Sequence, residues 1–219
     1  MFSCFKKKDR GPSETKPVEY VETVGVKTIA LIAGHQENGG ARAYNEAEEN
    51  EVNSRLVEEI IRSMPNHKII TRKRGHGSYS SEMKKHAKFC RDNKAEIAIE
   101  LHFNAAGVPE ARGAEALIKY GALDTISLAG MIVDKWCTQF DIKKRGNYRS
   151  VKGVKALKSR DRGAGFVNYM ESYGIKAIVW EPFFCDYETE ESQRFLNQRD
   201  QGVRIMANFW VNIIKQITK

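Results

Sequence analysis

Three short aliphatic runs constrain the fold of this 219-residue chain more than any other feature of its sequence. They are Thr28–Gly34, the first part of Ala98–Ala105, and Ile175–Trp180. Continuous apolar runs of this length are typical of strands that are buried on both faces of a parallel sheet. Because segments with helical periodicity separate them, we predict an α/β fold: a single domain with a twisted, mostly parallel sheet of about six strands, flanked by helices on both faces.

Each run ends by delivering polar side chains. His35 follows the first run, His102 and Asn104 follow the second, and Glu181 follows the third. In an open α/β sheet, ligands and chemistry collect at the carboxyl ends of the strands. We therefore expect these four side chains to meet in one site.

A helix is predicted to begin near Asn45 or Glu46 and to end at Met64. Its apolar residues recur at three- and four-residue steps from Val52 onward, and Glu49 extends that stripe into the first turn. A carboxylate on the inward face of a helix start points at the end of the sheet rather than into water. Glu49 therefore joins the candidate site.

The remaining pattern predicts further strands and helices. The predicted strands are His67–Arg72, Gly113–Tyr120 and Val154–Leu157. The predicted helices are one from Ser80 or Ser81 to about Asn93, then Leu123–Phe140, Phe166–Tyr173, and a single long helix over Thr189–Ile217.

The candidate site contains a set of metal-binding side chains. His35, Glu49 and His102 offer two imidazoles and one carboxylate, which is typical of catalytic zinc with a fourth position left to water. A histidine taken alone is more often structural, and no spacing rule identifies this set. Its placement at strand ends favours a metal site. The other histidines lack that placement and are predicted to lie on the surface: His67, His76 and His86.

Glu181 is the candidate general base and acid. It ends the apolar run Ala-Ile-Val-Trp, so hydrophobic neighbours are expected to raise its pKa and let it exchange a proton near neutral pH. The alternative is a structural role, in which the Glu181 carboxylate only caps backbone N–H groups or pairs with a lysine.

The net charge of +8 favours an anionic partner: nucleic acid, anionic lipid or an acidic wall polymer. Nucleic-acid binding is not expected, because the chain has no Cys₂His₂ spacing, no RNP-like aromatic motif and no sustained basic helix. The segment 143–162 carries nine Lys or Arg residues and is a candidate surface for anionic groups. A plain solvated loop is the alternative.

Residues 1–25 are predicted to form a flexible basic arm ahead of a domain that spans residues 26–219. No secretory signal and no transmembrane segment are expected, so the chain is predicted to be made in the cytoplasm. The cysteines show no paired spacing, which argues against a disulfide framework. They are Cys4, Cys90, Cys137 and Cys185.

Several short motifs, taken in chain order, resemble those of the zinc-dependent N-acetylmuramoyl-L-alanine amidases. This catalytic domain is shared by bacterial cell-separation amidases and many phage endolysins. The resemblance covers about Lys27 to the C-terminus. The motifs are Ala33-Gly-His35, Glu49-Asn-Glu-Val-Asn53, Thr71-Arg72, Glu100-Leu-His102-Phe-Asn104, and Val179-Trp-Glu181-Pro-Phe-Phe184.

The resemblance implies that His35, Glu49 and His102 bind Zn²⁺ and that Glu181 is the catalytic glutamate. It implies cleavage of the amide between the lactyl group of muramic acid and L-alanine in peptidoglycan. Asn104, with Arg160 and Arg162 from the basic segment, are weaker candidates for substrate contacts. The chain departs from the family pattern at Gln36–Gly40 and at Glu100, where serine is common.

Two other functions stay open from the sequence. One is a zinc carboxypeptidase or endopeptidase acting on wall peptides, because its chemistry is the same. The other is a non-catalytic module that binds an anionic wall polymer. The chain fits a phage endolysin released through a membrane lesion, and also a virion-associated lysin. The oligomeric state is left open.

Overall fold

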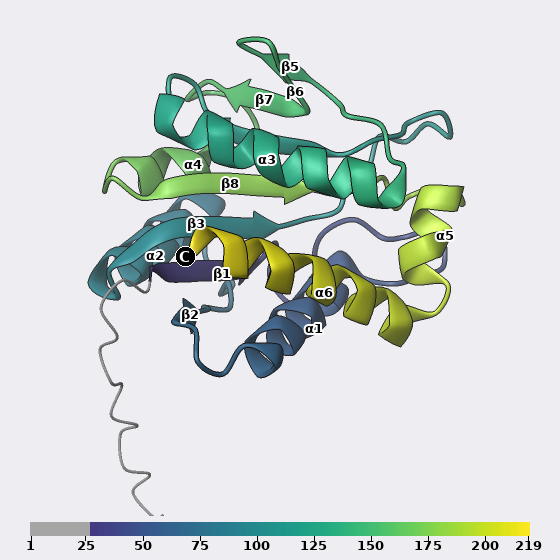
Figure 1. Ribbon diagram of the computed structural model, residues 1–219, viewed down its shortest axis with the longest axis horizontal. Coiled ribbons are helices and arrows are strands. Elements are labelled where there is room, and N and C mark those ends of the chain that lie inside the picture. Colours follow the sequence, from purple (N-terminus) through teal and green to yellow (C-terminus); the bar gives the residue numbers. More distant parts are fainter. Residues whose placement is uncertain (1–26) are drawn as a thin grey trace, which may run out of the picture.

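A six-stranded sheet carries the fold, with strand order β2-β1-β3-β8-β4-β7 (Figure 1). The computed structural model describes residues 27–219; the predicted arm over residues 1–25 lies outside the described residues. The strands of this sheet are β1 (Thr28–Ala33), β2 (Ile69–Ile70), β3 (Ala95–Leu101), β4 (Glu115–Lys119), β7 (Val154–Leu157) and β8 (Lys176–Glu181). A separate two-stranded ribbon pairs β5 (Asn147–Tyr148) with β6 (Val151–Lys152).

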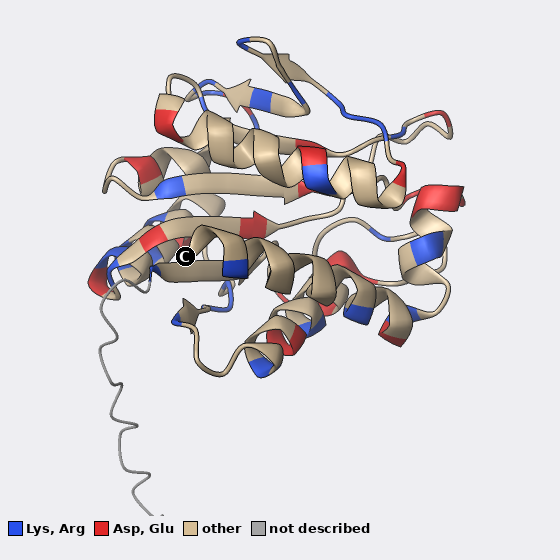
Figure 2. Cartoon of the chain, in the orientation of Figure 1, with Lys and Arg blue, Asp and Glu red and all other residues tan. Residues whose placement is uncertain are grey.

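The sheet is mostly parallel, which confirms the predicted fold class. β2, β1, β3 and β8 run in the same direction, so their carboxyl ends meet at one edge. β4 pairs with β8 antiparallel, with Glu115 opposite Glu181, and β7 follows β4 in parallel. Acidic residues mark the arrowheads of β3 and β8 at this edge (Figure 2).

Helices cover both faces of the sheet, as predicted (Figure 1). One core lies under α1, α3, α5 and α6, and a second, smaller core lies under α2 and α4. None of the described helices is long and apolar enough to cross a membrane. The bounds are α1 (Glu49–Ser63), α2 (Tyr79–Asp92), α3 (Leu123–Phe140), α4 (Ala164–Glu171), α5 (Glu190–Leu196) and α6 (Arg199–Ile217).

The larger core is organised around Trp136 of α3, which is fully buried. Its ring centroid lies 4.9 Å from that of Phe209, 5.1 Å from that of Phe195 and 5.7 Å from that of Trp180. The indole Nε1–H donates a hydrogen bond of 3.0 Å to the carbonyl of Pro182. This packing ties α3, α5 and α6 to the end of β8, where Glu181 lies.

The C-terminal segment is two helices, so the prediction of one long helix over Thr189–Ile217 is wrong. Thr189 caps α5 as its sequence suggests, accepting a hydrogen bond from the Ser192 backbone N–H. The chain then turns at Asn197 and Gln198 before α6 begins. A Cβ at Gly202 would lie 1.8 Å from the Phe195 carbonyl, so the close approach of the two helices requires glycine there. The apolar stripe continues across the turn and conceals it.

Local periodicity also misplaced other boundaries. Only Ile69–Ile70 of the predicted strand His67–Arg72 pairs with β1, because this segment lies at the sheet edge. The first helix begins at Glu49 instead of near Asn45, since Glu46 has a left-handed φ of 64° that a helix cannot continue.

His86 is buried, so its predicted surface position is wrong. The neighbouring lysines suggested an exposed helix, but His86 lies on the inward stripe of α2 with Met83, Ala87 and Cys90. Burial lowers the pKa of this imidazole to about 4, and the Arg72 Nη1 lies 3.3 Å from its Nδ1. His86 is therefore neutral near pH 7. The described cysteines, Cys90, Cys137 and Cys185, are free and buried.

Replacing Trp136 with phenylalanine is expected to lower the free energy of unfolding by about 2–3 kcal/mol. The change removes buried ring volume and leaves the Pro182 carbonyl without its donor. Urea-induced unfolding measures this. Leu123→Ala, at a side chain that is 53% exposed, is the control and is expected to change stability by less than about 0.5 kcal/mol. Equal effects of the two variants would contradict this account of the core.

Candidate active site

His35, Glu49 and His102 converge at the carboxyl edge of the sheet. Each offers one potential ligand atom, and these atoms all lie within 4.8 Å of one another. β1 and β3 are neighbours in the sheet, so the residues that follow them, His35 and His102, lie side by side. Glu49 is the first residue of α1 and reaches the same point from the helix that covers these strands. The structure thus brings together all three predicted ligands, and this group can hold a metal ion.

The Glu49 carboxylate bridges the two imidazoles. His102 Nδ1 lies 2.8 Å from Glu49 Oε1, and His35 Nε2 lies 3.4 Å from Glu49 Oε2. The two rings meet edge to face, with centroids 4.8 Å apart. The donor atoms therefore surround a small common space instead of pointing to separate partners.

Backbone donors hold Glu49 in this position. The Phe103 N–H donates to Oε1 at 2.9 Å, and the Ala41 N–H donates to Oε2 at 2.6 Å. Burial alone would raise the pKa of Glu49, but the hydrogen bonds with His102 and His35 hold that pKa far below its ordinary value. For His102, burial alone would lower the pKa, whereas Glu100 and Glu49 raise it well above its ordinary value. Glu49 is thus an anion inside the protein, as a metal ligand must be.

Two glycines make room for these side chains. A Cβ on Gly34 would lie 2.4 Å from His102 Cε1, so the imidazole packs directly on the Gly34 backbone. Gly40 has a φ of +105°, and a Cβ there would lie 2.6 Å from Glu49 Oε2. The Asn50 side chain donates to the carbonyls of Gly34 and His35, which fixes the turn after β1.

Glu181 ends β8, the strand next to β3, and lies beside the three-residue group. The ladder continues past the strand end, since the His102 N–H donates to the Trp180 carbonyl at 2.9 Å. Burial raises the pKa of Glu181 to about 8; Glu49 adds to this rise, whereas the nearby His102 opposes it. Among the described residues, nothing donates a hydrogen bond to its buried Oε2. This carboxyl group can take up and release a proton close to neutral pH.

Asn104 follows β3 at the same edge of the sheet, and its amide is already engaged. Its Nδ2 donates to Glu115 Oε1 at 2.8 Å, and its backbone pairs with Phe184. Glu115, which faces Glu181 across the β4–β8 ladder, is nearly buried. Sequence reasoning missed Glu115, because it begins a strand whose antiparallel direction cannot be read locally.

Comparisons with known proteins identify the family of this chain. A sequence profile of the family described as N-acetylmuramoyl-L-alanine amidase matches residues 29–214. The chain belongs to this amidase family. It is therefore an amidase hydrolase whose substrate is peptidoglycan. No curated protein sequence matches.

Solved structures share the fold at low sequence identity. The N-acetylmuramoyl-L-alanine amidase from Clostridium difficile 630 is 16% identical, with a TM-score of 0.65 over 88% of this chain and 96% of that one. The amidase Ami1 from Mycobacterium smegmatis is 9% identical, with a TM-score of 0.66 over 90% and 99%. The catalytic domain of the CD27L endolysin, which targets Clostridia difficile, is 19% identical, with a TM-score of 0.60 over 85% and 97%.

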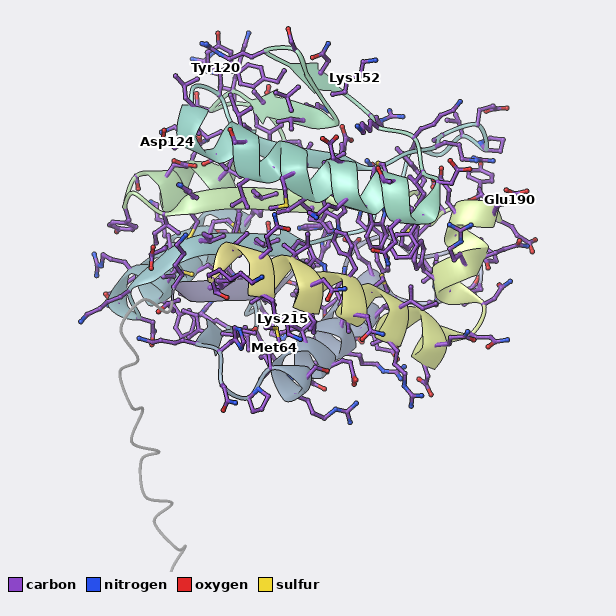
Figure 3. All side chains as sticks on the ribbon, viewed as in Figure 1. Met64, Tyr120, Asp124, Lys152, Glu190 and Lys215 are labelled. Carbon is purple, nitrogen blue, oxygen red and sulfur yellow. The ribbon has the colours of Figure 1, made fainter. Side chains whose placement is uncertain are left out.

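Among the described residues, no contact brings Arg160 or Arg162 to the site of this amidase. Both are exposed in the loop after β7. The end of β7 lies beside Tyr120, at the end of the molecule opposite Glu190 (Figure 3). On β4, Lys119 pairs with Leu157 at the end of β7, whereas Glu115, four residues earlier, pairs with Glu181. Their role in substrate binding stays a prediction.

Another arginine of the basic segment does reach the edge of the site. Arg145 Nε lies 3.7 Å from Glu115 Oε1, and its guanidinium carbon lies 4.7 Å from the centre of the Phe184 ring. Nothing in the sequence distinguishes Arg145 from the other basic residues of segment 143–162. An isolated β-bridge between Ala114 and Lys144 sets the position of Arg145. This β-bridge joins residues far apart in the chain.

Replacing Gly34 with alanine is expected to displace the His102 ring and to lower metal affinity by at least about tenfold, the size of effect seen when ligand orientation is disturbed. The new methyl group would overlap the imidazole, whereas the backbone at Gly34 has no positive φ that would strain alanine. Competition with a metal chelator measures the affinity. Wild-type affinity in this variant would mean that His102 is not a ligand in the position described.

The pH dependence of stability is expected to change in Glu181→Gln, measured on metal-free protein. The Glu181 carboxyl has a pKa of about 8 when folded, against an ordinary 4.5. Between these values the unfolded chain loses the proton and the folded chain keeps it, so wild-type stability falls as the pH rises from about 4.5 to about 8. Glutamine carries no such penalty. The melting temperature of the variant should therefore gain on the wild type between pH 5 and pH 8, and a constant difference would contradict the raised pKa.

Proposed function

We propose that this amidase is zinc-dependent, that His35, Glu49 and His102 hold the ion, and that Glu181 transfers the proton. The proposal rests above all on one observation: two imidazoles bridged by an ionised buried carboxylate, next to a carboxyl group whose pKa is raised to about 8. The bond cleaved is the amide between the lactyl group of muramic acid and L-alanine of the stem peptide.

The donor set fits zinc. Imidazole nitrogen and carboxylate oxygen are common zinc ligands, and catalytic zinc sites use three protein ligands with one position left for water or substrate. The Glu49 anion is already formed, and Gly34 and Gly40 leave space for the side chains around a common point. When bound, zinc supplies Lewis acidity and makes a water a stronger acid near neutral pH.

Glu181 performs the proton transfers. Its carboxylate accepts a proton from the attacking water and then delivers that proton to the alanine nitrogen as the amide C–N bond breaks. A pKa near 8 in the metal-free protein makes both steps feasible, since the group neither holds nor loses its proton too firmly. The hydrophobic end of β8 around Trp180 excludes bulk water from this side.

The substrate contacts that we propose come from Asn104 and from two exposed arginines of the basic segment. Asn104 donates to Glu115, the residue paired with Glu181 in the β4–β8 ladder, and this position at the carboxyl edge supports a role in placing substrate. Arg160 and Arg162 are exposed, and among the described residues no carboxylate forms an ion pair with them, which leaves their guanidinium groups able to bind stem-peptide carboxylates.

The biological setting that we propose is lysis of the cell wall by a phage-type enzyme. The endolysin catalytic domain among the similar structures supports this setting. The fold by itself is common to bacterial amidases and endolysins, so the support comes from likeness and from the basic charge, which suits an anionic wall.

Mass spectrometry of digested peptidoglycan tests the cleavage site. Release of intact stem peptides that carry a free L-alanine amine is expected. Shortened peptides on uncut glycan would instead show a carboxypeptidase or an endopeptidase. Binding to the wall without any product would show a non-catalytic module.

Glu181→Gln is expected to lower the rate of wall cleavage by about 10²–10⁴-fold, because the proton carrier is lost, while stoichiometric zinc stays bound. His35→Ala and His102→Ala are expected to lose the zinc itself, as measured by metal analysis of the purified protein. Turnover of Glu181→Gln near the wild-type rate would remove Glu181 from the mechanism. Zinc retained by both histidine variants would mean that the ligands are others.

A further inference from the structure

A buried carboxylate outside the three-residue group contacts one of its histidines. Glu100 lies on β3, two residues before His102, so both side chains lie on the same face of the sheet. Its Oε2 lies 3.3 Å from His102 Nε2, and only 4% of its side chain is exposed. The opposite ring nitrogen, Nδ1, faces Glu49. The imidazole is thus held between two carboxylates, one at each nitrogen.

The surroundings of Glu100 leave His102 as its one basic partner among residues 27–219. The Tyr79 hydroxyl, whose pKa is raised to about 12 by burial and by the negative charge of Glu100, donates to the Gly163 carbonyl. His86 is neutral and faces Arg72, and that arginine pairs with Glu82. Among residues 27–219, His102 is the only basic side chain within ion-pair distance of the Glu100 carboxylate. Burying an unpaired carboxylate costs several kcal/mol. The contact with His102 therefore offsets the cost of burying Glu100.

Glu100 does not belong to the ligand group itself. The atoms that lie within 4.8 Å of one another come from His35, Glu49 and His102. Glu100 approaches the ring from its other nitrogen, which is where an orienting partner of a metal-bound histidine lies. In the sequence, Glu100 stands at a position where serine is common in the family pattern.

We propose that Glu100 is a positioning residue that fixes the tautomer and the orientation of His102 for metal binding. The inference rests on the proposed zinc site. When Nδ1 holds the ion, the imidazole would be neutral and its Nε2–H would donate to Glu100, so the lone pair of Nδ1 would be directed at the common point shared with Glu49 and His35. The Gly34 backbone packs against the ring and limits its rotation, so the carboxylate and the glycine together define one ring position.

The test uses Glu100→Gln, which keeps the size of the side chain and removes its charge. The matched control is Glu115→Gln, which neutralises a nearly buried carboxylate that contacts Asn104 and Arg145 but no proposed ligand. Two properties of the full chain are measured: the zinc dissociation constant by chelator competition, and the protonation of the two His102 ring nitrogens by ¹⁵N NMR of the zinc-loaded protein. Neither readout depends on activity.

Glu100→Gln is expected to weaken zinc binding by about 10–100-fold, the range found for orienting partners of metal ligands. The NMR spectrum is expected to show rings bound through either nitrogen in place of the single Nδ1-bound, Nε2–H form, because an amide can also donate a hydrogen bond to Nε2 and so no longer selects one tautomer. Glu115→Gln should keep both wild-type zinc affinity and the wild-type tautomer. A merely structural role of Glu100 would lower the melting temperature of the metal-free protein without changing the tautomer, and that result overturns the inference.

The remaining outcomes separate this inference from the proposed function. A wild-type protein that binds zinc, with Glu100→Gln binding it equally well, overturns the role of Glu100 alone. A wild-type protein without zinc affinity overturns the metal site and the role of Glu100 together. An equal loss of affinity in Glu115→Gln would show a general effect of charge, and the inference would fail.

Discussion

The site depends on the buried carboxylate of Glu49. It accepts hydrogen bonds from two backbone amides and contacts both imidazoles, so it joins α1 to the ends of β1 and β3. A buried carboxylate is costly unless hydrogen bonds and opposite charge satisfy it. Here those partners hold its pKa far below the ordinary value and keep it ionised. The same contacts that make its burial tolerable also gather the nitrogen donors around it.

The sheet topology explains why a proton carrier lies beside this group. β8 is the strand next to β3 and runs parallel to it, so Glu181 and His102 emerge at the same edge. β4 then reverses direction and brings the start of its own strand, Glu115, to that edge. Several carboxylates therefore share a small buried region with few cations. Burial and this accumulation of negative charge together raise the pKa of Glu181 to about 8.

The carboxylates of this edge thus fall into different roles through their surroundings. Glu49 is surrounded by donors and is an anion, whereas Glu181 lacks a donor to its Oε2 and tends to hold a proton. Glu100 faces the far nitrogen of His102. One chemical group, placed at three points around two histidines, can therefore serve as ligand, proton carrier and orienting partner.

The sequence by itself determined the positions of the main side chains of the site. Continuous aliphatic runs mark buried strands, so the residues that follow them, His35, His102 and Glu181, were expected at one edge. The inward stripe of a helix likewise identified Glu49. These signals are local, since each depends on a periodicity of a few residues. For the same reason α3 (Leu123–Phe140) and β7 (Val154–Leu157) were predicted with their observed bounds.

Only the tertiary structure decided which neighbours these residues meet. The contact of Glu100 with His102, the packing of that ring on Gly34 and the burial of His86 all depend on how separate elements pack. The turn between α5 and α6 was hidden because the apolar stripe continues across it, while Gly202 and Phe195 approach closely in space. Periodicity reports which face of an element is buried. It does not report what lies against that face, because packing partners are set by contacts between residues far apart in the chain.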